Sequence, residues 1–138
     1  MTSLYERKGM NLPRLQHASL PVAPGGQAKV REFYGGVLGL QEKPAPPVLA
    51  ARGILWFAAG DNEMELHFIP DTEHPANPKE GRHICLEVPD VEQWRVTIRD
   101  AGYEIIEDAP LLHRPRFFCH DPFGNRLEFT TIEGNYLG

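Results

Sequence analysis

The sequence repeats itself, and this repeat constrains the fold more than any other feature. The segment HASLPV at 17–22 is echoed 66 positions later by HICLEV at 83–88. The segment NEMEL at 62–66 is echoed 63 positions later by NRLEF at 125–129. Because the two offsets nearly agree, we interpret the chain as two copies of one module of about sixty residues. The modules are placed at about 12–69 and 82–132, within a single domain 12–138 that follows an N-terminal extension 1–11; residues 70–81 form the linker.

Each module is expected to contain one helix and four strands, in the order βαβββ. Short alternating runs predict strands, and apolar residues at helical spacing predict the helices. Gly39 and Gly102 are placed to end the two helices, and Asp90 is the expected N-cap of the second. The fold class is therefore α+β, with the helices on one face of the sheets. The expected elements are strands 15–22, 40–43, 49–58 and 63–69 with a helix at 30–38, then strands 83–88, 103–106, 116–120 and 126–131 with a helix at 91–101.

The composition excludes several classes of partner. Fourteen basic residues against nineteen acidic ones give a formal charge of −5, without a Lys/Arg block, so no nucleic acid partner is expected. No apolar run approaches the ~18 residues of a membrane span, so no membrane partner is expected. Cys85 and Cys119 are too few for a disulfide scaffold. A cytoplasmic enzyme or small-molecule binding protein is the expectation.

Two histidines and two glutamates recur at matching places in the modules. Side chains alternate along a strand, which puts His17, Glu65, His83 and Glu128 on the sheet faces that the helices do not cover. Charged groups on a covered face need partners or water. A divalent metal would satisfy all four, and two imidazoles with two carboxylates suit Zn, Ni, Co, Mn or Fe(II). The plainer alternative is that these faces are solvated and the four residues are ordinary.

Other residues are expected on the same faces. Of each aromatic pair, Trp56–Phe57 and Phe117–Phe118, one ring should face the core and the other the opposite side. Arg116 and Arg126 are candidates to bind an anionic substrate, although solvated arginines are the more common case. The same alternation gives Cys85 the face of His83, and nothing in the sequence indicates an activated nucleophile there.

Several segments resemble the vicinal-oxygen-chelate superfamily, which includes glyoxalase I, fosfomycin-resistance proteins, extradiol dioxygenases and bleomycin-resistance proteins. The similar segments are LQHASLPV at 15–22, FYGGVLGL at 33–40, MEL at 64–66, RHI at 82–84 and DPFGNRLEF at 121–129. The resemblance implies that the mixed sheets of the two modules curl around a metal-binding cleft. It also implies His17, Glu65, His83 and Glu128 as the metal ligands, with Glu128 as the catalytic base and Glu65 as the second choice. A homodimer is implied as well.

The resemblance favours a metal-dependent lyase or isomerase of glyoxalase type, acting on a small oxygen-rich substrate. An Fe(II) extradiol dioxygenase using His17, His83 and Glu128 is the second hypothesis. The third is a bleomycin-resistance-like binding protein that is not an enzyme. His67 shares the face of Glu65; we expect it to support the ligands or line the cleft, and its alternative role is to replace Glu65 as a ligand.

Overall fold

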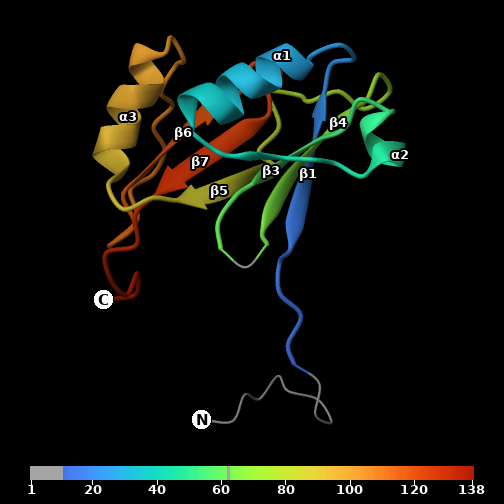
Figure 1. Cartoon of the computed structure of the whole chain (residues 1–138). Helices are drawn as coiled ribbons and strands as arrows, with labels where there is room; N and C mark the ends of the chain where they lie inside the picture. Colours follow the sequence, from blue (N-terminus) through green and yellow to red (C-terminus); the bar gives the residue numbers. More distant parts are fainter. Residues whose placement is uncertain (1–10, 62) are drawn as a thin grey trace.

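The computed structural model describes residues 11–61 and 63–138, and in these residues two mixed β-sheets lie beneath helices (Figure 1). The first sheet has the order β1-β4-β3-β2 and the second the order β5-β7-β6. The first module comprises β1 (His17–Val22), α1 (Gln27–Val30), η1 (Arg31–Val37), β2 (Glu42–Lys43), α2 (Pro47–Ala50), β3 (Leu55–Ala58) and β4 (Glu65–Pro70); the second comprises β5 (His83–Glu87), α3 (Val91–Asp100), β6 (Arg116–His120) and β7 (Arg126–Thr130).

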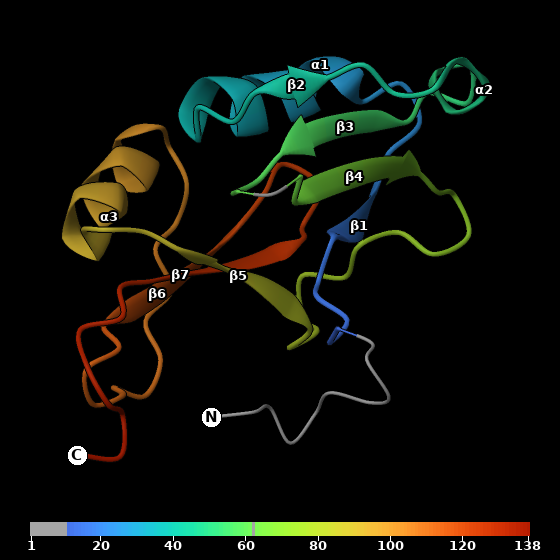
Figure 2. The same cartoon turned by 60° about the horizontal axis from the view of Figure 1, so that its bottom comes forward.

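The two modules share one internal plan, which confirms the α+β fold with tandem modules. In each, the first strand pairs in parallel with the last, β1 with β4 and β5 with β7. An antiparallel strand then pairs with that last strand, β3 in one module and β6 in the other. Figures 1 and 2 show α1, η1 and α3 gathered on one side of the sheets, which leaves the other side without a helical cover.

Both expected helices are present, the first at 27–37 rather than 30–38 and the second at Val91–Asp100. Asp90 caps α3, since its side chain accepts hydrogen bonds from the backbone N–H groups of Glu92 and Gln93. Gly39 and Gly102 adopt φ values of +75° and +96°, a region that favours glycine at the end of a helix. The first helix begins at Gln27 and widens from α-helical to π-helical turns in η1.

Two expected strands differ from the structure. Residues 49–58 were expected to be one strand, but β3 covers only Leu55–Ala58 and the helical turn α2 precedes it. Pro47 starts that turn, where its fixed φ favours a helix and its missing N–H costs nothing. The strand expected at 103–106 is reduced to one bridge between Ile106 and Phe118. In the described residues, the second sheet therefore has three strands and the first has four.

A buried hydrogen bond ties the two modules together. The Tyr34 hydroxyl in η1 donates to Asp121 Oδ2 at 2.7 Å, and both side chains are buried. Burial and the nearby carboxylate raise the pKa of Tyr34 well above its usual range, so the phenol keeps its proton. Asn125 also donates to the Pro21 carbonyl at 3.0 Å, across from the second module to β1. One apolar core, containing Phe33, Phe68 and residues of both sheets, runs beneath these contacts.

The aromatic pairs divide as expected. Phe57 and Phe117 lie in the core, while Trp56 and Phe118 lie on the opposite faces. Most of the expected N-terminal extension 1–11, and Asn62 of the repeat, lie outside the described residues. In the described part of the chain, no helix is long and apolar enough to cross a membrane.

We predict that Tyr34→Phe lowers the free energy of unfolding by about 1.5–3 kcal/mol, because it leaves the buried Asp121 carboxylate without its phenol donor. Denaturant titration of both proteins measures the difference. Tyr103→Phe is the matched control, since the Tyr103 hydroxyl makes no hydrogen bond to any described residue, and it should change stability by less than about 0.5 kcal/mol. Equal effects of the two variants would contradict a role for this bond in joining the modules.

Candidate functional site

His17 begins β1, and a chain of hydrogen bonds fixes the orientation of its ring. Gln16 Nε2 donates to the Glu63 carbonyl at 2.6 Å, which leaves Gln16 Oε1 as an acceptor facing the ring. His17 Nδ1 lies 2.8 Å from this oxygen and must donate to it. The proton therefore sits on Nδ1, and Nε2 is left with its lone pair. A ring held in this way by an oxygen on one nitrogen is typical of a metal-binding histidine.

Three stacked rings cross the first sheet. The Trp56 and His67 rings lie 4.2 Å apart, and His67 and His17 lie 4.1 Å apart, with the planes nearly parallel in both pairs. The rings come from the neighbouring strands β3, β4 and β1, so the stack ends at the exposed His17 on the edge strand. The Trp56 indole N–H is buried and has no acceptor among the described residues. The result is a flat, aromatic sheet face.

Glu65 is held by two basic neighbours on this face. Its carboxylate accepts hydrogen bonds from Lys43 Nζ and, at 2.9 Å, from His67 Nε2. The Lys43 ammonium, followed by His67, lowers the pKa of Glu65 from 4.5 to about 2, against the opposing effect of burial. Lys43 lies in the two-residue strand β2, which pairs with β3 opposite Trp56. Glu65 is therefore ionised, and Lys43 of the same module balances its negative charge.

The second module carries a similar pair. His83 Nδ1 donates to the Gly81 carbonyl at 2.7 Å, and His83 Nε2 lies 2.9 Å from Glu128 Oε1. A neutral imidazole with its proton on Nδ1 presents a lone pair to this carboxylate. Two acceptors so close together require a shared proton or a cation between them. This is the place in the described chain where the geometry calls most directly for a positive charge.

Arginines surround Glu128 and the aromatic ring beside it. Arg116 Nη1 lies 3.5 Å from Glu128 Oε2. The guanidinium groups of Arg116 and Arg126 lie over the Phe118 ring, at 5.2 and 4.1 Å from its centroid. Desolvation of the Cys85 thiol, with the Glu128 carboxylate nearby, raises the pKa of that thiol to about 11, so it is not an activated nucleophile.

The strand register revises how the two modules correspond. His17 stands opposite Glu65 in the first sheet, whereas His83 stands opposite Arg126 in the second. Ser19 stands opposite His67, and Cys85 opposite Glu128. By register, the counterpart of Glu128 is therefore His67, and that of Glu65 is Arg126. The sequence repeat had aligned Glu128 with Glu65, which lies two residues before His67 on β4. A shift of two residues along a strand keeps the side chain on the same sheet face.

The four expected ligands thus lie on the uncovered faces, but in two separate pairs. Within residues 11–61 and 63–138, no three side chains of the ligating types converge closely enough to hold a metal ion. His17, His83 and Glu128 fit a metal chemically, because both rings are anchored through Nδ1 and Glu128 faces His83 Nε2. Glu65 fits less well, because Lys43 and His67 occupy its oxygens. A metal centre shared by all four residues would require the uncovered sheet faces of the first and second modules to come together.

Sequence reasoning missed two residues that shape the site. Lys43 lies in a strand of two residues, too short to show an alternating pattern. Gln16 precedes β1 and acts through an amide whose orientation depends on Glu63, far along the chain. The one sequence signal for Gln16 was its place next to His17, and no comparable signal marked Lys43.

A family model describing the Glyoxalase/Bleomycin resistance protein/Dioxygenase superfamily matches residues 14–129, nearly the whole chain. The chain belongs to this superfamily. The match spans both modules and every candidate residue named above, which agrees with the resemblance of the sequence to vicinal-oxygen-chelate proteins. A search of curated proteins finds no match.

Several solved structures share this fold. A protein assigned to the glyoxalase family, from Bacillus anthracis, is 28% identical with a TM-score of 0.78, covering 89% of this chain and 98% of its own. An antibiotic binding protein from Streptomyces sp. CB03234 is 20% identical with a TM-score of 0.70, covering 89% and 98%. A lactoylglutathione lyase from Agrobacterium tumefaciens is 16% identical with a TM-score of 0.63, covering 88% and 96%. These structures include an enzyme and a binding protein, so the fold alone does not choose between the two activities.

We predict that Lys43→Met raises the pKa of Glu65 from about 2 towards 4.5, because the variant removes the main stabiliser of the carboxylate. Carbon-detected NMR titration of the Glu65 carboxyl measures the change, and Lys29→Met, on α1, is the control. The wild-type pKa lies below the unfolded value. Glu65 therefore stabilises the fold above about pH 4.5, and this contribution is lost as the pH falls towards 2. An unchanged pKa in Lys43→Met would show that other groups hold the charge.

Proposed function

We propose that this protein is a metal-dependent enzyme of glyoxalase type, a lyase or isomerase acting on a small oxygen-rich substrate. The proposed ligands of the divalent metal (Zn, Ni, Co, Mn or Fe) are His17, Glu65, His83 and Glu128. The observation that carries the proposal is the orientation of the two histidines. Each ring is fixed through Nδ1 by an oxygen acceptor, and His83 Nε2 faces the Glu128 carboxylate across 2.9 Å.

When bound, such an ion supplies Lewis-acid stabilisation to negative charge that develops on substrate oxygens. The proton transfer falls to the carboxylates of this chain. Glu128 is the better base, because the pKa of about 2 at Glu65 makes that group a weak proton acceptor. Glu128 also lies next to Arg116, which limits where its second oxygen can turn. The stacked rings of Trp56, His67 and His17 give a flat substrate a surface to lie against.

The fourth ligand has a competitor. Glu65 is proposed from the family resemblance, whereas the register makes His67 the counterpart of Glu128. Two variants that preserve shape separate these roles: Glu65→Gln keeps the hydrogen-bonding outline, and His67→Phe keeps the ring stack. The variant that loses bound metal identifies the ligand.

We also propose that two copies of the chain form a homodimer and that each cleft is built across the two copies. The separation of the ligand pairs on one chain supports this, because the first-module face of one copy can meet the second-module face of the other. A symmetric dimer would then contain two equal clefts.

A binding protein without metal is the second candidate. It is favoured by the basic side chains that already accompany both carboxylates, Lys43 at Glu65 and Arg116 at Glu128. An Fe(II) dioxygenase is a variant of the first candidate, using His17, His83 and Glu128 and leaving Glu65 with Lys43. The identity and presence of the metal separate these activities.

We predict about one transition-metal ion per chain in untagged protein after reconstitution and dialysis, measured by elemental mass spectrometry. His83→Ala should lose it, and His113→Ala, altered in a surface loop, should retain it. Bound nickel or zinc would direct assays to α-ketoaldehyde hemithioacetals, and iron to catechols. Absence of metal from the reconstituted wild type would overturn the enzyme proposal in favour of the binding protein.

We further predict that mixing His17→Ala and His83→Ala copies restores metal binding. If clefts cross between chains, each mixed dimer contains one wild-type cleft, so about a quarter of all clefts recover after random exchange. If each cleft lies within one chain, every cleft keeps one damaged half and nothing recovers. Light scattering gives the oligomeric state of the same samples.

A further inference from the structure

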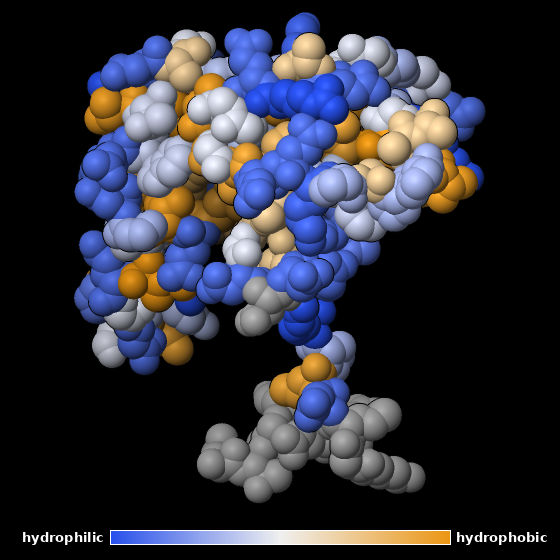
Figure 3. All heavy atoms as spheres, in the orientation of Figure 1, coloured by the Kyte–Doolittle hydropathy of each residue, from blue (hydrophilic) through white to orange (hydrophobic). Residues whose placement is uncertain are grey.

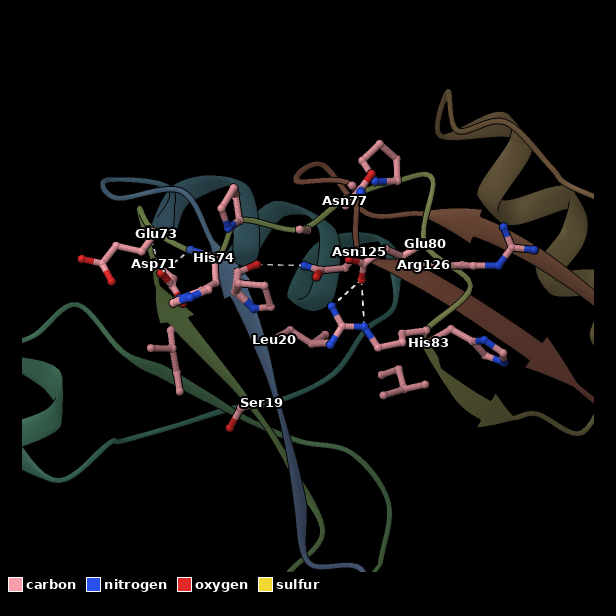
Figure 4. A pocket seen from close by; sticks show the side chains of 18 residues that line it. Ser19, Leu20, Asp71, Glu73, His74, Asn77, Glu80, His83, Asn125 and Arg126 are labelled. Carbon is pink, nitrogen blue, oxygen red and sulfur yellow. Dashed lines mark hydrogen bonds and ion pairs between the residues drawn. The ribbon is translucent and has the colours of Figure 1, made fainter.

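A cavity of about 940 Å³ lies between the edge strands β1 and β5, beneath the linker that joins the modules (Figure 4). Its volume suits a small organic ligand. Apolar side chains from both modules line it: Leu20 on β1, Ile69 on β4 and Ile84 on β5. The cavity continues to the sheet faces of the proposed site, because Ser19 and His83 also line it.

Arg126 lies at the end of this cavity next to β5 and β7, beside His83 (Figure 4). Its guanidinium rests 4.1 Å from the centre of the Phe118 ring, which holds the plane of the group. Within the described residues, no carboxylate lies within 4.0 Å of it, and its N–H groups donate no hydrogen bond. Neighbouring Arg116 differs, because it is occupied by Glu128.

The other charged side chains that line the cavity already have partners or lie away from Arg126. At the end away from Arg126, Asp71 accepts hydrogen bonds from the backbone of Glu73 and His74, so its carboxylate serves the loop. Glu80 lies on the side of Arg126, where its carboxylate is engaged by Arg82 (Figure 4). Figure 4 shows Glu73, Asp71 and His74 on the opposite side from Arg126 and His83. The side of the cavity that holds Arg126 therefore has a half-buried arginine without an anionic partner among the described residues, since the nearby Glu80 carboxylate is engaged by Arg82.

We propose that Arg126 binds the carboxylate of the ligand, and that the ligand is a carboxylic acid with an apolar body lying along Leu20, Ile69 and Ile84. A guanidinium presents paired N–H donors in the geometry of a carboxylate, which makes a bidentate contact at a site already ordered by Phe118. This inference rests on the proposed binding of a small molecule at this cleft, and it adds the chemical class of that molecule.

The test uses 2-naphthoate and its neutral counterpart 2-naphthamide as probes, titrated by calorimetry in the presence of EDTA. EDTA keeps the measurement independent of any metal. We expect Arg126→Gln to weaken 2-naphthoate binding about tenfold or more and 2-naphthamide binding less than about twofold. Arg126→Lys should fall between, because it keeps the charge and loses the paired donors. Arg99→Gln, on the outer surface of α3, is the matched control, and thermal unfolding checks that each variant folds.

The outcomes separate the inference from the proposed function. If Arg126→Gln binds 2-naphthoate as tightly as the wild type, the inference is wrong and small-molecule binding stands. If both probes weaken equally, Arg126 supports the cavity through Phe118 rather than through an anion, and the inference is again wrong. If the wild type binds neither probe, both the carboxylate site and the proposed small-molecule cleft lose their support.

Discussion

The buried contact between Tyr34 and Asp121 decides how the two modules face each other. Each module alone is a small sheet with a helix on one side, and nothing within one module fixes how the other module is oriented against it. Tyr34 donates to Asp121 across the module boundary, while Asn125 donates to Asp121 and to the Pro21 carbonyl. Because an unpaired buried carboxylate is costly, this set of bonds has essentially one arrangement. The helices α1 and α3 then share one side of the sheets (Figures 1 and 2). On the face of the molecule drawn in Figure 3, hydrophilic and hydrophobic residues are interspersed.

Charge on these faces is compensated locally. Glu65 is paired with Lys43 and His67, and Glu128 with His83 and Arg116. Such pairing allows a carboxylate to remain ionised while nine-tenths buried, which a lone glutamate would not tolerate. A divalent cation at the cleft would have to compete with Lys43 for Glu65, whereas at His83 and Glu128 it would relieve the contact of two acceptors. The two halves of the site are therefore unequal partners for a metal.

The sequence is a good guide to this fold because its signals are local. The repeat, the caps at Asp90 and Gly102, and the alternation in β1 and β7 depend on residues close together in the chain. The prolines before α2 were equally local, but their helical turn was concealed by an apolar run that also suits a strand. What the sequence could not show is the register between strands far apart. That register makes His67 the counterpart of Glu128, and it depends on sheet pairing that no short motif encodes.

The same register gives the two faces opposite charges. The first-module face combines Lys43 with Glu63 and Glu65, one cation with two carboxylates. The second-module face combines Arg116 and Arg126 with Glu128, two cations with one carboxylate. In the proposed homodimer, the unlike faces would attract and the like faces repel, which would favour contact between the first module of one copy and the second module of the other. A ligand carboxylate at Arg126 would reduce this attraction by neutralising the excess cation. In the proposed homodimer, ligand binding and closure of the cleft would then be coupled through the Arg126 guanidinium.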